Sequence, residues 1–341
     1  MRAPDFWGEP QGPMASLVSG LLTPIGAALD AAGRLRRAVA RPYRAPVPVI
    51  CVGNLVAGGA GKTPVVLSLA DILERRGIAA HIVMRGYGGR LSGPLAVAPE
   101  IHDAADVGDE ALLAAAQAPC WVARNRVAAV RAAVGGGARA IVLDDGFQNP
   151  SVAKDLSLVV VDGGYGFGNG RLLPAGPLRE KIAAGLGRAD AVVLLDGDPA
   201  RRPAELIGFD RPVLHARLEA ISGEHFARAR VVAFAGIGRP EKFFATLRRL
   251  GANLVCIQAF PDHHAFRESD LAELREIAER EQAPLVTTHK DWVRLPPEWR
   301  SQVEVLRVQV RWRDEPALEA TLAPVLRRCT LAELPPRPHG G

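Results

Sequence analysis

The most informative residues of this 341-residue chain form a glycine-rich loop that ends in Gly61, Lys62 and Thr63. An apolar run over residues 48–52 precedes the loop, and leucine and isoleucine at helical spacing follow it. In such a loop, glycines let backbone N–H groups turn toward a polyphosphate, and the helix N-terminus adds partial positive charge. The lysine reaches the terminal phosphates and the threonine can hold Mg²⁺. We therefore predict a nucleoside triphosphate site formed by Gly58, Gly59, Ala60, Gly61, Lys62, Thr63 and Pro64.

One position departs from the usual phosphate-loop pattern. That pattern has glycine five positions before Gly61, where this chain has Val56. The alternative interpretation is a glycine-rich loop that binds nothing. The order of strand, Gly-Lys-Thr and helix argues against that alternative.

Carboxylates stand where Mg²⁺ needs a second partner. Asp144 and Asp145 follow an apolar run over residues 138–143, which predicts a strand. A carboxylate at the end of a neighbouring strand can face the phosphate loop. Asp109 and Glu110 open an alanine- and leucine-rich helical pattern, where the helix dipole alone would favour them. An acidic turn without a metal is the alternative for Asp144, but Lys62 and Thr63 upstream favour a metal site.

The chain has one pair of adjacent histidines, His263 and His264, next to Asp262. Neighbouring side chains on an extended segment point apart, and no cysteine or glutamate completes a metal-ligand set. We therefore expect a catalytic or orienting imidazole. Residues 287–291 also follow a predicted strand, but they lack the spacer between lysine and aspartate of a GTPase base reader, which favours ATP.

Two further turns are candidates for substrate contacts. Arg85 and Tyr87 lie in a glycine-rich turn at the end of the predicted strand 80–84, where open α/β sheets bind ligands. Arg171 and Arg179 lie in a Gly- and Pro-rich loop over residues 168–180, and together with Lys181 they could clamp an anionic group.

The elements that must position these residues alternate between strand and helix along most of the chain. This alternation predicts an α/β fold with a P-loop-type, mostly parallel sheet flanked by helices and a second, smaller α/β domain. The predicted division is an N-terminal helical segment, a P-loop domain, a smaller α/β domain and a tail, at residues 1–45, 46–220, 221–330 and 331–341.

The composition is that of an ordinary globular protein. Hydrophobic residues make up 48% and charged residues 23%, which excludes a disordered chain. The net charge of +5 favours anionic partners without choosing between phosphates, lipid and nucleic acid. Four widely separated cysteines predict reduced thiols in a cytosolic chain, and we expect no secretory signal.

Residues 14–41 predict an amphipathic helix. On a helical wheel its apolar side chains fall within an arc of about 140°, and Arg34, Arg36, Arg37 and Arg41 cluster at its end. We interpret this helix as lying on an anionic membrane surface without a transmembrane span. A helix packed on the protein's own core is the alternative. No nucleic-acid partner is expected, because the arginines lack interleaved aromatic residues and no recognised binding module appears.

The chain as a whole resembles the tetraacyldisaccharide 4′-kinase family of lipid A assembly. The resemblance rests on ordered blocks at residues 52–54, 58–64, 85–89, 108–110, 144–148, 174–180, 262–264 and 287–291. It implies two α/β domains, an amphipathic N-terminal helix, and an ATP- and Mg²⁺-dependent kinase. The implied acceptor is the 4′-hydroxyl of a tetraacylated glucosamine disaccharide 1-phosphate, the lipid A precursor, at the cytoplasmic face of the inner membrane. The resemblance also implies that Val56, which departs from the general phosphate-loop pattern, is a usual feature of the family.

The resemblance also implies roles for single residues. Asp109 would be the base, assisted by His263, with Asp145 and Lys62 completing the catalytic group. Thr63, Glu110 and Asp144 would hold Mg²⁺. The implied substrate-binding residues are Asn54, Arg85, Tyr87, Gln148, Arg171, Arg179 and Glu180. A membrane-associated P-loop switch ATPase of the positioning or partitioning type is the alternative, although such proteins carry lysine where this chain has Ala57.

Overall fold

One twelve-stranded sheet runs through the protein in the computed structural model, which describes residues 4–8, 13–198 and 203–331. The strand order is β10-β9-β11-β12-β8-β7-β6-β1-β5-β2-β4-β3. The strands are β1 (Val49–Gly53), β2 (Ala80–Met84), β3 (Leu95–Ala96), β4 (Cys120–Val122), β5 (Ala140–Asp144), β6 (Leu156–Asp162), β7 (Ala191–Leu195), β8 (Val213–Ile221), β9 (Arg230–Ala235), β10 (Asn253–Ala259), β11 (Leu285–Thr288) and β12 (Val303–Trp312). All neighbours are parallel except β3 with β4 and β8 with β12. The predicted fold class is confirmed.

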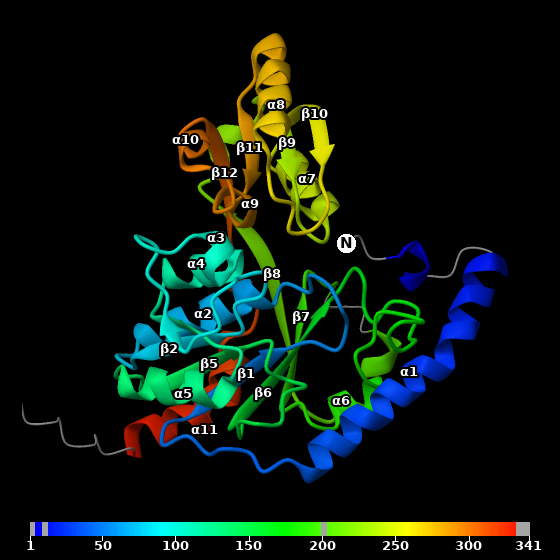
Figure 1. The fold of residues 1–341 in the computed structure, drawn as a ribbon, viewed down its shortest axis with the longest axis vertical. Helices are drawn as coiled ribbons and strands as arrows, with labels where there is room; N and C mark the ends of the chain where they lie inside the picture. The colour runs from blue at the N-terminus through cyan, green and yellow to red at the C-terminus, as the bar shows by residue number, and fades with distance from the viewer. Residues whose placement is uncertain (1–3, 9–12, 199–202, 332–341) are drawn as a thin grey trace, which may run out of the picture.

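Helices cover both faces of this sheet (Figure 1). They are α1 (Pro13–Val39), α2 (Lys62–Glu74), α3 (Ala104–Val107), α4 (Asp109–Ala115), α5 (Arg126–Gly135), α6 (Ile182–Leu186), α7 (Pro240–Arg249), α8 (Glu268–Glu281), α9 (His289–Trp292), α10 (Pro297–Arg300) and α11 (Glu315–Leu331). The larger lobe contains β1 to β7. Helices α2, α4 and α11 contribute to one of its two hydrophobic cores, and α5 and α6 contribute to the other. Central strands such as β1 are buried along their whole length because both faces are covered.

The smaller lobe comprises β9 to β12 with α7 to α10, and the antiparallel pair of β8 and β12 joins it to the larger lobe (Figure 1). Alternate residues of β9 face two different cores, one shared with α7 and one with α8. The predicted division at residue 220 falls within β8 and stays a prediction. The predicted tail lies outside the described residues, apart from Leu331 at the end of α11.

Helix α1 lies along the outside of the larger lobe, next to the loop that follows β6 (Figure 1). Its small side chains face the protein. Ser19 Oγ donates a hydrogen bond to the carbonyl of Ala175 at 2.6 Å, and a Cβ at Gly26 would come within 2.9 Å of Leu172 Cβ. Its apolar face is exposed, with Leu21 71% accessible. The alternative in which this face packs on the core is therefore not what the structure shows.

The same helix contains a stretch, Ser16–Val39, that is long and apolar enough to cross a membrane. This criterion rests on length and composition alone, and core helices and signal sequences also meet it. Only 17% of the most apolar window is buried inside the protein.

Candidate active site

The phosphate loop lies at the carboxyl end of β1, at the edge where the other parallel strands also end. Gly53 closes the strand against Phe147, whose Cβ would lie 2.3 Å from any Cβ at this position. Gly61 has φ of 79°, a conformation that favours glycine, and it packs on the end of the Leu195 side chain. Val56 is buried and pairs with Leu178, which explains why this position carries a core side chain rather than glycine.

Lys62 begins α2 and points toward polar groups of the larger lobe. Its Nζ lies 3.2 Å from Asn54 Oδ1 and 3.5 Å from Asp145 Oδ1. Arg179 Nη1 donates to both oxygens of Asp145, at 2.9 and 3.0 Å. Burial acts to raise the pKa of Asp145, but the two cations outweigh it and hold that pKa below its ordinary value. Lys62, Asn54, Asp145 and Arg179 thus form one polar cluster, in which the two cations could bind a phosphate group.

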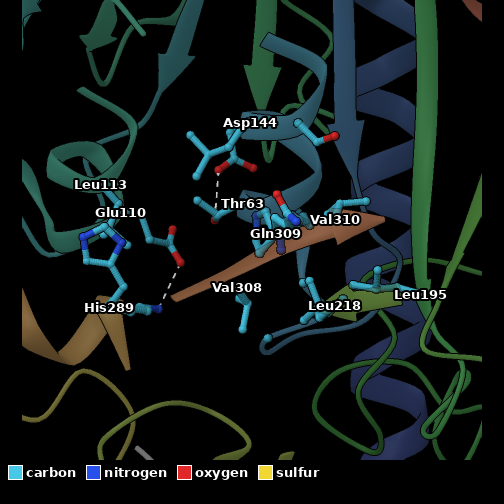
Figure 2. Close-up of a pocket in the computed structure, with 18 of the residues that line it drawn as sticks. Thr63, Glu110, Leu113, Asp144, Leu195, Leu218, His289, Val308, Gln309 and Val310 are labelled. Atoms are coloured by element: carbon cyan, nitrogen blue, oxygen red, sulfur yellow. Dashed lines mark hydrogen bonds and ion pairs between the residues drawn. The ribbon is translucent and has the colours of Figure 1, made fainter. Parts of the chain in front are cut away.

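Thr63 and Asp144 form the best candidate site for a divalent cation. Thr63 Oγ1 lies 3.5 Å from Asp144 Oδ2, and the other oxygen of Asp144 is buried without a hydrogen-bond partner (Figure 2). Burial raises the pKa of Asp144 to about 7, with the charge of Glu110 adding to the rise. A hydroxyl and a carboxylate next to a phosphate loop suit Mg²⁺, which takes its other ligands from water and phosphate.

This candidate site is not a cluster of protein metal ligands. Across the described ranges, no group of three or more His, Cys, Asp or Glu side chains could hold a metal. Glu110, the third predicted metal ligand, lines the same cavity, and its Oε1 accepts a hydrogen bond from Lys290 Nζ at 3.0 Å. Its role as a ligand stays a prediction.

Asp109 and His263 meet across the two lobes. Asp109 Oδ2 lies 3.0 Å from His263 Nδ1, and the other ring nitrogen lies 3.4 Å from Lys290 Nζ. The Asp109 side chain is only 4% exposed, whereas that of His263 is 32% exposed. Burial acts to raise the pKa of Asp109, but the hydrogen bond from His263 and the charges of Lys290 and Arg294 outweigh it. The pKa of Asp109 therefore lies below its ordinary value, and the carboxylate form prevails.

A cavity of about 1660 Å³ between the lobes contains most of these groups. The phosphate loop, Glu110, Asp144, Asp145 and His263 line it. Its apolar wall comes from Leu195, Leu218, Val308 and Val310, on β7 and on the ribbon of β8 and β12 (Figure 2). The cavity thus offers phosphate-binding, metal-binding and apolar surfaces side by side.

The predicted substrate-binding residues fall into two sets. Arg85, Tyr87 and Arg179 line the cavity, and the Tyr87 ring lies 5.4 Å from that of His263. Gln148 and Glu180 instead bond to each other, with Nε2 of Gln148 also donating to the carbonyl of Asn54. Arg171 reaches Thr23 on α1 at 3.2 Å. The residues of the second set therefore contact other parts of the protein and do not line the cavity.

The sequence prediction missed a second ionic contact between the lobes. Arg239 Nη1 and Lys242 Nζ, at the start of α7, each lie 2.6 Å from Asp162 Oδ2. Lys242 also lies 3.2 Å from Asp196. Asp162 and Asp196 each come at the end of an apolar strand, as Asp144 does. That position in the sequence could have marked them as candidate site residues. Arg294, which contacts Asp109, carried no signal in the sequence.

Comparisons with known proteins point to one family. The model of the family described as tetraacyldisaccharide-1-P 4′-kinase matches residues 18–327. A tetraacyldisaccharide 4′-kinase of Rhodospirillum centenum is 56% identical over 328 residues, covering 96% of this chain and 97% of that protein. One from Rhodospirillum rubrum is 53% identical over 344 residues, covering 98% and 100%. The crystal structure of LpxK from Aquifex aeolicus in complex with ATP is similar with a TM-score of 0.74 and 26% identity, covering 90% of this chain and 99% of that one.

Proposed function

Because this chain belongs to the tetraacyldisaccharide-1-P 4′-kinase family, we propose that Asp109 and His263 form its catalytic pair and that Thr63 and Asp144 hold its Mg²⁺. The protein is an ATP-dependent kinase of lipid A biosynthesis. It transfers the γ-phosphate of ATP to the 4′-hydroxyl of a tetraacylated glucosamine disaccharide 1-phosphate. The alternative of a switch ATPase is not supported, and Ala57 already argued against it.

The observation that carries the catalytic proposal is the 3.0 Å contact of Asp109 with His263, a residue that lines the cavity containing the phosphate loop. In the reaction, the 4′-oxygen forms a bond to the γ-phosphorus and the bond to the β,γ-bridging oxygen breaks, releasing ADP. The hydroxyl proton passes to Asp109, which His263 orients. Phosphoryl transfer depends mainly on positioning and charge neutralisation, so the base needs only to orient and deprotonate.

The remaining groups have separate tasks. Residues 58–64 bind the phosphates of ATP, and Lys62 neutralises charge on the transferred phosphoryl group. We assign the apolar wall of Leu195, Leu218, Val308 and Val310 to the adenine of ATP. Thr63 and Asp144 would hold Mg²⁺, which would supply positive charge to offset that of the phosphate groups. Glu110, predicted as a further ligand, holds Lys290 near the pair and raises the pKa of Asp144.

We assign the acceptor sugar to the side of the cavity lined by Arg85, Tyr87 and Arg179. Tyr87 offers an exposed ring close to His263, and an arginine suits an anionic group. Transfer of radiolabel from γ-labelled ATP to extracted tetraacyl disaccharide 1-phosphate tests the activity. Labelled inorganic phosphate without labelled lipid would instead indicate an ATPase.

Mg²⁺ use should depend on pH through Asp144. Because its pKa is raised to about 7 in the metal-free protein, the ligand is protonated below that pH and must lose a proton on binding Mg²⁺. The free Mg²⁺ concentration for half-maximal kinase activity should therefore rise by about tenfold per pH unit below about pH 7 and level off above it. Steady-state assays at saturating ATP measure this dependence.

Two variants control that experiment. Asp144→Asn reports the pH dependence that comes from ATP itself, and Asp210→Asn changes an exposed carboxylate outside the site. An unchanged pH dependence in Asp144→Asn would remove Asp144 from the metal site.

We further propose that α1 holds the enzyme peripherally on the cytoplasmic face of the inner membrane. Three features support this position: the outward apolar face, the small side chains that pack on the lobe, and the arginines at the helix end. The inward face carries the buried Asp30 and the ion pair of Arg37 with Glu180 at 3.5 Å. These contacts favour a helix that stays on the protein over one that leaves it to span the bilayer.

Replacing Leu21, Ile25 and Leu29 with serine should weaken binding to vesicles that contain anionic lipid. Each exposed side chain would lose roughly 1.5–3 kcal/mol of burial in the interface, so the triple change should lower the partition coefficient by at least about 100-fold. Co-sedimentation with vesicles measures the coefficient. Ile101→Ser with Ile207→Ser is the matched control, since both isoleucines are exposed elsewhere. Equal binding by the triple variant and the control would remove α1 from the membrane contact.

A further inference from the structure

Arg294 is a buried arginine that contacts Asp109 and the backbone segments next to His263. It follows α9 in the smaller lobe, and its side chain is only 7% exposed. Its Nε lies 3.4 Å from Asp109 Oδ2, the same oxygen that faces His263. A guanidinium is always charged and offers five donors in a rigid fork, so it can hold several acceptors at once.

The same side chain fixes the backbone that carries His263. Arg294 Nη2 donates to the carbonyl of Gly236 at 2.8 Å, and Nη1 donates to the carbonyl of His264 at 3.1 Å. The Gly236 carbonyl also accepts the backbone N–H of His263 at 3.1 Å. His263 has φ of 57°, a conformation that non-glycine residues rarely adopt without support from their surroundings.

Arg294 is itself held in place. Its Nη2 pairs with Asp291, a carboxylate with no exposed surface, and its Nε bonds to the carbonyl of Lys290 at 3.2 Å. Asp291 in turn accepts hydrogen bonds from the N–H of Gly236 at 2.9 Å and from Thr288 Oγ1 at 2.6 Å. The guanidinium therefore cannot rotate away without breaking several buried bonds.

We propose that Arg294 is a positioning residue for phosphoryl transfer, which fixes Asp109 of the larger lobe against His263 of the smaller lobe. The inference rests on the proposed role of Asp109 and His263 in the reaction. Arg294 takes no proton and touches no substrate. It sets the distance and angle between a carboxylate and an imidazole that come from segments 154 residues apart.

The test is the kinase activity of Arg294→Gln and Arg294→Lys. Misplacing a catalytic group by about 1 Å costs roughly 100-fold in rate, so Arg294→Gln should lower kcat by about that factor. The KM for ATP should change by less than about threefold, because the phosphate loop is untouched. Arg294→Lys keeps a charge near Asp109 but loses the forked guanidinium. Its kcat should therefore lie between that of the unaltered enzyme and that of Arg294→Gln.

A double-mutant cycle separates positioning from general damage. In an Asp109→Asn background, Arg294→Gln should change the residual kcat by less than about threefold, because the group it positions is already gone. Arg300→Gln is the matched control. Arg300 also donates to backbone carbonyls of the smaller lobe, those of Leu295 and Val293, and it stacks on Trp292. It should lower the melting temperature without a comparable loss of kcat.

Three results would overturn the proposal: an unchanged kcat in Arg294→Gln, an equal loss in both backgrounds, or an equal loss in Arg300→Gln. If Arg294→Gln fails to fold, Arg294→Lys carries the same comparisons. Full activity of Asp109→Asn alone would instead refute the proposed role of Asp109, so the two failures are distinguishable.

Discussion

Replacing Asp109 with asparagine should lower kcat for lipid phosphorylation by about 10²–10⁴-fold, the usual contribution of a general base. The amide has the size of the carboxylate but cannot accept the hydroxyl proton. ATP affinity should stay nearly unchanged, because Asp109 lies at the start of α4 and Lys62 and Thr63 keep their places. Single-turnover transfer of labelled phosphate to the lipid and equilibrium binding of ATP measure the two quantities separately.

The control for this variant is Asp106→Asn. Asp106 lies three residues away, pairs with Arg90 and caps α3, so its replacement removes a charge from the same region without touching the pair. It should keep full activity. Asp109→Asn with undiminished turnover would show that another group takes the proton, and His263 would be the next candidate, since its ring is more exposed to the cavity.

Lys62→Ala should lower kcat by about 10²–10³-fold, because a preorganised positive charge at the transferred phosphoryl group would be lost. The structure adds a second reason. Lys62 lies between Asn54 and Asp145, so its removal leaves the carboxylate balanced by Arg179 alone and more repulsive to phosphate. Steady-state kinetics should show a raised KM for ATP as well as the lower kcat.

Lys181→Ala is the matched control for Lys62→Ala, since it removes a lysine from an exposed position at the start of α6. Its kinetics should be those of the unaltered enzyme. If both lysine variants behave alike, Lys62 does not act on phosphate.

The sequence predicted the local features of this protein well. The prediction of a strand followed by Gly61, Lys62 and Thr63 depends only on residues that are close in sequence. The structure places this loop at the start of α2, as expected. The strand predicted at residues 80–84 corresponds to β2 and the helix predicted at residues 14–41 to α1. The family resemblance and the kinase activity are confirmed by the family match and the relatives. The roles of single site residues stay predictions.

Features that depend on the relative position of distant segments were not predicted. Strand β8 was missed because Arg217 and Glu219 interrupt its apolar residues, and it is its pairing with both β7 and β12 that makes it a strand. The contact of Arg294 with Asp109 depends on how the two lobes meet. A helical wheel gave the apolar face of α1 but not the side on which the protein lies.

The position of α11 has a consequence for how this enzyme is made. The last helix contributes Leu318, Leu322 and Val325 to the same core as the first strands of the larger lobe. A ribosome must therefore deliver almost the whole chain before that core can close, although the phosphate loop emerges early. Until then, part of the sheet stays exposed in the nascent chain. Dividing the protein into two fragments near residue 220 would leave both fragments with an incomplete core. Removing residues 315–331 should leave the rest of the protein dependent on chaperones or prone to aggregation.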